Sequence, residues 1–227
     1  MTLIKENIKK VEARIARAAQ RVGRDVDDIS LVAVAKTVSA EKIEEAIACG
    51  VKIIGENRVQ EAKQKFQRIG SKADWHMVGH LQTNKAKDAL RIFSLIHSLD
   101  SLRLAEELEK RAEKPIDCLI EVNTSQEKTK FGITPENLSA FFESIRNLKN
   151  VHIMGLMTIG PGWAISDPEA ARPCFRLLRD LRERLAQESH IQLPILSMGM
   201  TSDFEIAIEE GASMIRLGTA LFGPRGE

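Results

Sequence analysis

The 227-residue sequence contains no tyrosine, and aromatic residues make up only 4% of it. Without tyrosine, no phenol is available as a proton donor or acceptor. The two tryptophans, Trp75 and Trp163, are expected to be packing residues. The three cysteines, Cys49, Cys118 and Cys174, are far apart and form no Cys-x-x-Cys pair. Their odd number and their spacing argue against a disulfide framework or a zinc site, and they suit a reducing compartment.

An excess of charge of one sign is also lacking, because 33 basic side chains face 32 acidic ones and the net charge is +1. This balance gives no indication of a nucleic acid or a membrane surface as a partner. No apolar stretch approaches the roughly 20 residues that a bilayer-spanning helix needs. Lys5, Glu6, Lys9 and Lys10 make the N-terminus unlike a signal peptide. We therefore expect a cytoplasmic protein.

Short apolar runs alternate with helical patterns along the whole chain. Apolar residues from Ile4 to Val22 recur at spacings of four and three, which predicts a leading amphipathic helix over 1–23. Eight strands with intervening helices predict one domain over 1–227, a (β/α)8 TIM barrel. A doubly wound open sheet is the alternative, because strand order cannot be deduced from one sequence. The predicted strands are 30–36, 52–57, 74–79, 94–99, 116–123, 151–159, 194–199 and 214–218.

Several helix starts can be located from capping chemistry. Serine, threonine and aspartate before an apolar pattern favour a helix N-terminus, and proline is favoured at the first helical position. A serine followed three residues later by glutamate has the form of a capping box. The predicted starts are Ser39 (helix to Gly50), Thr134 with Pro135 next, about Asp167 (helix to Ala186), and the box Ser202-x-x-Glu205.

A lysine ends the first predicted strand, where 31–36 reads Leu-Val-Ala-Val-Ala-Lys. This run does not alternate with polar residues, which is typical of a strand covered on both faces. Barrels place their active sites at the carboxyl ends of the strands, so Lys36 is predicted at the functional rim. A desolvated lysine loses its proton readily, and the neutral amine forms Schiff bases. The alternative is a solvated or ion-paired lysine.

The last two strand-to-helix junctions indicate an anion site. Thr201 and Ser202 precede a helix, and the free N–H groups at a helix start favour phosphate. Gly218 and Thr219 follow the last strand, where glycine allows the backbone to approach a ligand closely. The alternative is that Ser202 only caps a helix and Gly218 only relieves crowding. Barrels commonly bind phosphate at these two junctions, which favours the anion site.

A ligand with an aldehyde at one end and a phosphate at the other would connect Lys36 to this anion site. Pyridoxal 5′-phosphate has that form, and so has a sugar-phosphate aldehyde in an aldolase. Neither the Walker pattern nor Gly-x-Gly-x-x-Gly occurs, so a nucleotide is the weaker choice.

Several sequence blocks, in order over essentially the whole chain, are specific enough to indicate a family. Together they closely resemble the pyridoxal phosphate homeostasis protein family. The resemblance implies a barrel similar to the N-terminal domain of bacterial alanine racemase, with pyridoxal phosphate held as a Schiff base on Lys36. The blocks are Val34-Ala35-Lys36-Thr37, Gly55-Glu56-Asn57, Trp75-His76 with Gly79-His80-Leu81-Gln82-x-Asn84-Lys85, Gly155-Leu156-Met157, Ser197-Met198-Gly199-Met200 and Arg216-Leu217-Gly218-Thr219-Ala220-Leu221-Phe222-Gly223.

The same resemblance assigns the other cofactor contacts. It implies that Arg216 meets the pyridine nitrogen and that Asn57 lies beside the ring. The phosphate would be held by Thr201, Gly218 and Thr219. No metal site is implied.

Whether such a protein is an enzyme depends on proton transfer. Racemisation in the alanine racemase manner uses the cofactor lysine and a tyrosine from a second domain of a partner subunit. This chain has no tyrosine and leaves no room for that domain. Arg216 beside the ring nitrogen would also oppose its protonation and weaken the electron sink. We therefore expect a monomeric carrier or regulator that supplies apo-enzymes, with no catalytic residues; a racemase or weak Cα–H exchange enzyme is the alternative.

Overall fold

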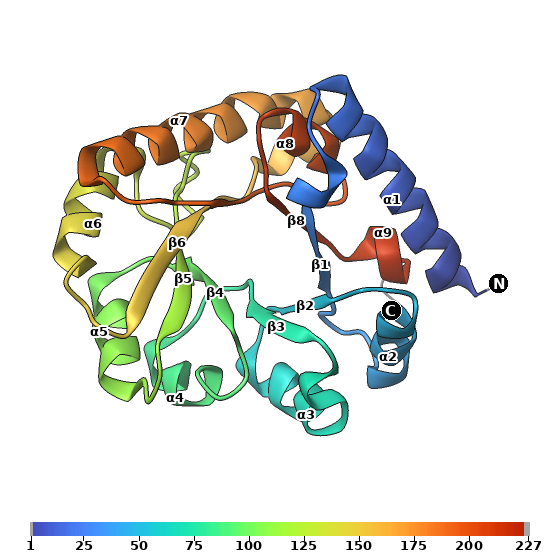
Figure 1. Ribbon diagram of the computed structural model, residues 1–227, viewed down its shortest axis with the longest axis horizontal. Helices are drawn as coiled ribbons and strands as arrows, with labels where there is room; N and C mark the ends of the chain where they lie inside the picture. The colour runs from blue at the N-terminus through green and yellow to red at the C-terminus, as the bar shows by residue number, and fades with distance from the viewer. Residues whose placement is uncertain (1, 225–227) are drawn as a thin grey trace.

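The computed structural model describes residues 2–224, and it shows a closed barrel of eight parallel strands inside a layer of helices (Figure 1). Neighbouring strands pair in chain order, and β1 closes the barrel on β8, where Val32 lies opposite Arg216. The predicted (β/α)8 barrel is confirmed and the open sheet is excluded. The strands are β1 (Ser30–Val34), β2 (Ile53–Glu56), β3 (Asp74–Met77), β4 (Leu95–Leu99), β5 (Ile116–Glu121), β6 (Val151–Met157), β7 (Ile195–Ser197) and β8 (Met214–Leu217).

Each observed strand lies inside its predicted range, and most end earlier than predicted. Residues at the carboxyl rim leave the hydrogen-bonded ladder to form loops, so Lys36 lies two residues beyond the end of β1. Both faces of the strands are covered, as the continuous apolar runs predict. Val32, Leu119 and Met157 belong to the cluster inside the barrel, while neighbours such as Ala33 pack outside it.

The helices lie on the outside of the barrel (Figure 1). None of them, within residues 2–224, is both long and apolar enough to cross a membrane. The helices are α1 (Leu3–Arg21), α2 (Ala40–Ala48), α3 (Val59–Ile69), α4 (Ala86–Ala89), α5 (Leu102–Arg111), α6 (Leu138–Ile145), α7 (Arg172–Ser189), α8 (Phe204–Glu209) and α9 (Thr219–Phe222).

The leading helix, predicted over 1–23, is α1; Met1 lies outside the described residues. Its predicted apolar face is buried from Ile4 to Ala18, but Val22 is 41% exposed. The helix ends at Arg21 and Val22 is its C-cap with a φ of −118°, so this side chain leaves the helical stripe. Ala19 is buried in its place.

Two of the predicted helix starts are displaced by short 3-10 turns. The turn Pro135–Asn137 follows Thr134, so α6 begins only at Leu138. The turn Pro168–Ala171 likewise delays α7 to Arg172 rather than Asp167. Ser39 does precede α2, although its side chain makes no capping hydrogen bond.

The predicted capping box at Ser202 is wrong. The N-cap of α8 is Asp203, whose Oδ1 accepts a hydrogen bond from the Met200 N–H at 2.6 Å. Glu205 does not reach back to the helix start, because it forms an ion pair with Arg14 of α1 at 2.8 Å. A partner distant in sequence therefore takes the side chain that the local pattern assigned to capping.

The two tryptophans differ in their surroundings. Trp75 is 2% exposed and packs edge-on against Phe66, which confirms its predicted packing role. Trp163 is 57% exposed, so the same prediction is wrong for that residue. It lies in the 3-10 turn Gly162–Ile165 of the β6–α7 loop, outside the packed layers.

Candidate functional site

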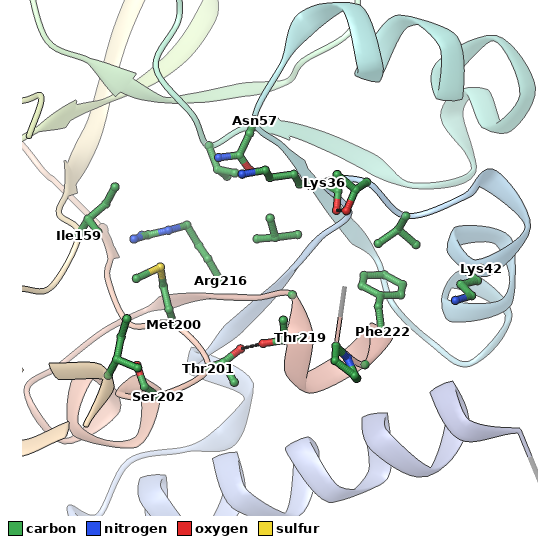
Figure 2. Close-up of a pocket in the computed structure, with 18 of the residues that line it drawn as sticks. Lys36, Lys42, Asn57, Ile159, Met200, Thr201, Ser202, Arg216, Thr219 and Phe222 are labelled. Atoms are coloured by element: carbon green, nitrogen blue, oxygen red, sulfur yellow. Dashed lines mark hydrogen bonds between the residues drawn. The ribbon is translucent and has the colours of Figure 1, made fainter. Parts of the chain in front are cut away.

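A cavity of about 710 Å³ lies at the carboxyl ends of β1, β2, β7 and β8. Its walls combine polar groups with apolar side chains such as Val34, Val78 and Met200, a composition typical of cofactor sites. Figure 2 shows Lys36 and Arg216 entering this cavity. All six residues that the sequence indicated as cofactor contacts line it: Lys36, Asn57, Thr201, Arg216, Gly218 and Thr219.

Lys36 is carried by a tight turn at the end of β1. The Val38 N–H donates to the Ala35 carbonyl oxygen at 2.9 Å, which closes the turn. Thr37 inside the turn has a φ of +64°, a left-handed conformation that is strained for a β-branched residue. The backbone at Lys36 therefore has a specific and costly geometry.

Arg216 forms the buried end of the cavity. This residue of β8 is 5% exposed. Its Nη1 donates to Ser197 Oγ at 2.6 Å and its Nη2 to the Thr158 carbonyl oxygen at 2.8 Å. Burial lowers the pKa of Arg216 to about 10, while Asp203 and Glu121 act in the opposite direction. The guanidinium stays charged at neutral pH and holds its position through neutral acceptors.

A chain of hydrogen bonds continues from Arg216 into the barrel interior. Ser197 Oγ lies 2.9 Å from His97 Nδ1, and His97 Nε2 lies 3.1 Å from His76 Nδ1. Arg216 donates to the Ser197 hydroxyl. In the tautomer that carries the His97 proton on Nε2, the Ser197 hydroxyl donates onward to His97 Nδ1 and His97 donates to His76 Nδ1. Burial lowers the pKa of His76 to about 4 and that of His97 well below its usual value, so both rings are neutral.

The anion end of the cavity is built from the loop after β7 and the start of α9. The Thr219 and Thr201 hydroxyls lie 3.2 Å apart across it. The loop turns sharply at Gly199, where φ is +90° and an added Cβ would lie 2.5 Å from the Ala207 Cβ. The hydroxyls and the free N–H groups at the start of α9 are donors that suit a phosphate.

Asn57 offers an unpaired polar atom in the cavity wall. Its Oδ1 is buried and has no hydrogen-bond partner among residues 2–224. Gly79 allows the next loop to pack directly on Asn57, since a Cβ there would lie 2.6 Å from the Asn57 carbonyl oxygen. A buried polar atom without a partner is costly, so a ligand that supplied a hydrogen bond would fit this position.

Two carboxylates at strand ends, Asp100 and Glu121, do not line the cavity. Asp100 pairs with His80 Nδ1 at 2.9 Å, and the His80 ring stacks on Phe131. Glu121 is 6% exposed at the end of β5. Burial raises the pKa of Glu121 to about 7, with Asp100 adding to the effect.

The Ser197–His97–His76 chain was not predicted from the sequence. His97 and Ser197 are 100 positions apart, and only closure of the barrel brings them into contact. The cluster of Glu56, Glu61 and Lys65 behind the Lys36 turn was not predicted either. The spacing of Glu61 and Lys65 by four residues in a helix was the one available signal.

Comparison with known proteins agrees with the cofactor contacts that line the cavity. Residues 7–226 match the family model described as the N-terminal domain of alanine racemase. A pyridoxal phosphate homeostasis protein of Aquifex aeolicus is 48% identical over 224 residues, which cover 97% of each chain. This chain belongs to the pyridoxal phosphate homeostasis protein family. The resemblance deduced from the sequence blocks is thus confirmed.

Solved structures extend the comparison with this family. PipY of Synechococcus elongatus PCC7942, with PLP bound, is 35% identical, and the match covers 92% of this chain and all of that one with a TM-score of 0.80. An alanine racemase of Clostridium difficile 630 has a TM-score of 0.74 at 14% identity, which shows a shared fold. The match covers 99% of this chain and 57% of the racemase.

Proposed function

We propose that this protein binds pyridoxal phosphate in the cavity at the carboxyl rim and takes part in intracellular pyridoxal phosphate homeostasis. The main support is that one cavity has a lysine at one end and a pair of threonine hydroxyls at the other. The printed names of the relatives, and PipY with PLP bound, support this ligand. Residues 1–227 form one cofactor-binding domain in this proposal.

The finer part of the proposal is a Schiff base on Lys36. Its formation joins Nζ to the aldehyde carbon and releases one water. Thr201, Gly218 and Thr219 bind the phosphate, and Asn57 supplies a hydrogen-bonding group beside the ring. Arg216 donates to the ring nitrogen.

We further propose a carrier or regulator rather than a racemase. Pyridoxal phosphate supplies an electron sink when its ring nitrogen is protonated. Arg216 is charged and has no carboxylate among its hydrogen-bond partners within residues 2–224, so it opposes that protonation. The chain also has no tyrosine to act as a second proton-transfer group. A monomeric state, a cytoplasmic location and apo-enzymes as recipients complete this proposal.

The test is the visible absorption spectrum of the purified protein with added pyridoxal phosphate, before and after borohydride. We expect a yellow band that borohydride removes, with the label on Lys36 in peptide mass spectrometry. Lys36→Ala should lose the band. Lys42→Ala is the matched control, because Lys42 lines the same cavity from α2 and should leave the band unchanged. A band that persists in Lys36→Ala, with the label elsewhere, would reject the Schiff base on Lys36.

Incorporation of deuterium from the solvent distinguishes a carrier from a racemase. A carrier should not introduce deuterium at the Cα of amino acids incubated with the loaded protein in D₂O. Steady incorporation that disappears in Lys36→Ala would establish the enzyme instead.

A further inference from the structure

Three charged side chains hold the backbone on both sides of Lys36. Lys65 of α3 donates from Nζ to the Ala35 carbonyl oxygen at 2.6 Å, just before Lys36. Glu61 of the same helix accepts the Thr37 N–H at 2.6 Å, just after it. Lys65 also joins Glu61 at 2.6 Å and Glu56, the last residue of β2, at 2.7 Å. We call Glu56, Glu61 and Lys65 the turn clamp.

The turn clamp does not belong to the cavity itself. None of its three side chains lines the cavity, so they act on the site through the turn. They secure a segment whose backbone is strained: Thr37 has a φ of +64°, and among residues 2–224 it is the only β-branched residue of the three non-glycine residues with a positive φ. A left-handed threonine persists only where its surroundings fix it. The Glu61 carboxylate supplies that restraint by accepting the Thr37 N–H.

The burial of the polar groups in the turn clamp indicates a role beyond stability. Glu56 is fully buried and Lys65 is 9% exposed. The second oxygen of Glu56, Oε2, has no hydrogen-bond partner among residues 2–224. Removing such groups from water is costly, and burial accordingly raises the pKa of Glu56 to about 7. Apolar residues of similar size often stabilise a protein as well or better. A geometric requirement at Lys36 explains why this arrangement is present.

We propose that Glu61, oriented by Lys65 and Glu56, is a positioning residue that keeps the Lys36 turn in its left-handed form and thereby directs the Lys36 amine into the cavity. This inference rests on the proposed Schiff base on Lys36. Without Glu61, Thr37 can relax to an ordinary φ. That change rotates the peptide between Lys36 and Thr37 and moves the amine away from the ligand aldehyde.

The first test compares Glu61→Ala and Glu61→Gln with a control on the same helix. Lys63→Met is that control, because Lys63 pairs with Asp88 at the surface and makes no hydrogen bond to the turn. We expect Glu61→Ala to form the yellow band about tenfold more slowly and with about tenfold weaker affinity for pyridoxal phosphate. Glu61→Gln should be intermediate, since its amide oxygen can still accept the Thr37 N–H. Lys63→Met should match the wild type.

A second readout uses the protein without ligand. Hydrogen exchange at the Thr37 amide should be faster in Glu61→Ala than in the wild type or Lys63→Met. Thermal unfolding of each variant shows whether the fold is retained. Unchanged affinity and rate in a folded Glu61→Ala, with wild-type labelling on Lys36, would overturn the inference and leave the proposed function intact. Wild-type protein that is never labelled on Lys36 would overturn both.

Thr37→Gly separates positioning from general support. Glycine adopts a positive φ without steric cost, so the turn no longer needs the restraint. We expect Glu61→Ala to weaken affinity by less than about threefold in the Thr37→Gly background, against about tenfold alone. An equal loss in both backgrounds would show that Glu61 does not act through the left-handed turn.

Discussion

At the scale of single residues, Arg216 shows how neutral neighbours can orient a charged group. Its hydrogen bonds go to Ser197 and to the Thr158 carbonyl oxygen, and no carboxylate in the described part of the chain hydrogen-bonds to the guanidinium. The Ser197 hydroxyl accepts from Arg216 and also lies 2.9 Å from His97 Nδ1, so His97 helps to fix the position of this hydroxyl. Replacing His97 therefore affects the cofactor site through two hydrogen bonds rather than by contact.

We predict that His97→Phe weakens pyridoxal phosphate binding while Lys36 remains the labelled residue. The buried Ser197 hydroxyl would lose its hydrogen bond to His97, which costs about 1–3 kcal/mol. Part of this cost is expected to appear as weaker binding, because Ser197 also orients Arg216. Absorbance titration with pyridoxal phosphate measures the affinity. His152→Phe is the control, because His152 is at the surface near Asp117. Equal affinities in both variants would show that the chain does not orient Arg216.

Glu121 gives a prediction about pH. Its pKa is about 7 in the folded protein against an ordinary value of 4.5, and burial is the main cause. The folded state thus holds this proton more tightly than the unfolded state, so the associated stability is present below pH 4.5 and is lost as the pH rises to about 7. As the pH rises from 5 to 8, the free energy of unfolding of Glu121→Gln should increase by about 1–3 kcal/mol relative to that of the wild type.

Urea unfolding of both proteins at several pH values measures this difference. Glu113→Gln serves as the control for the substitution itself, because Glu113 is exposed at the surface. A constant offset between Glu121→Gln and the wild type would contradict the raised pKa.

The residues of the site differ in how far the sequence predicts them. Lys36 and Thr219 could be placed at one rim because parallel barrel strands all end on the same side. Arg216 and Asn57 were assigned only by resemblance to the family, and the structure places both in the cavity wall. The turn clamp could not be predicted, because burial of Lys65 depends on how α3 lies against β1 and β2.

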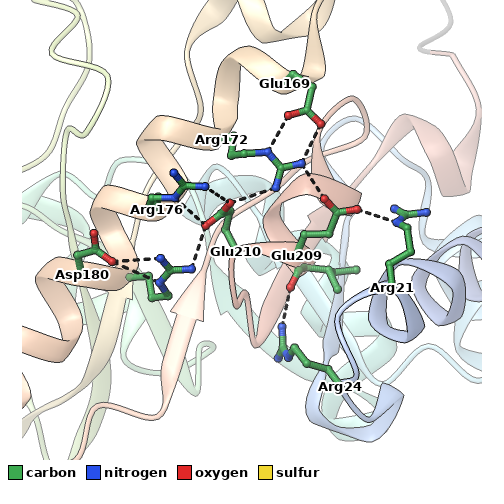
Figure 3. Close-up of polar contacts among 10 residues, drawn as sticks. Arg21, Arg24, Glu169, Arg172, Arg176, Asp180, Glu209 and Glu210 are labelled. Carbon is green, nitrogen blue, oxygen red and sulfur yellow. Dashed lines mark hydrogen bonds and ion pairs between the residues drawn. The ribbon is translucent and has the colours of Figure 1, made fainter.

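At the scale of elements, α1 is attached to α8 by side chains at its C-terminal end (Figure 3). Arg24 follows α1 and donates from Nη1 to the carbonyl oxygens of Ile208 and Ala212, at 2.9 and 2.8 Å. Ile208 lies in the last turn of α8 and Ala212 lies three residues beyond the helix end. The Ile208 carbonyl oxygen also accepts the Gly211 N–H at 3.0 Å. Glu210, next to α8, is 4% exposed and pairs with three arginines of α7: Arg172, Arg176 and Arg179.

We predict that Arg24→Met destabilises the protein by about 1–3 kcal/mol, because two carbonyl groups lose a charged donor. Denaturant unfolding measures this change. Arg17→Met is the matched control, since Arg17 is exposed on α1, and it should change the stability by less than about 0.5 kcal/mol. If the two variants were equally stable, the hydrogen bonds of Arg24 would not contribute to the stability of the contact between α1 and α8.

Elements were predictable where the pattern is local. The strands and α1 follow from apolar runs and helical spacing, and all of them form where predicted. The start of α8 was not predictable, because Glu205 is engaged by Arg14 from 191 positions away. A capping pattern indicates a helix start only when no distant charge competes for its glutamate.

At the scale of the whole molecule, the cavity lies at the seam where the two ends of the chain meet. β1 closes the barrel on β8, and the predicted contacts come from both sides of that seam. Lys36 follows β1, whereas Thr201 and Thr219 follow β7 and β8. Between β7 and β8 the register pairs Ser197 with Met214, and backbone hydrogen bonds from Met198 to Met214 and from Arg216 to Gly199 extend this pairing toward the site. The number of strands favoured a barrel, but strand order, and with it this seam, could not be deduced from the sequence.

A ligand bound at both ends of the cavity should therefore stabilise this seam more than the opposite side of the barrel. Saturating pyridoxal phosphate, at about 100 times its Kd, is expected to stabilise the fold by about 2.7 kcal/mol. Hydrogen exchange should slow most in β1, β7 and β8 and least in β4 and β5. Lys36→Ala keeps the phosphate contacts but loses the link to β1, so its protection should be confined to β7 and β8. Uniform protection of all eight strands would mean that the ligand stabilises the barrel without joining its two ends.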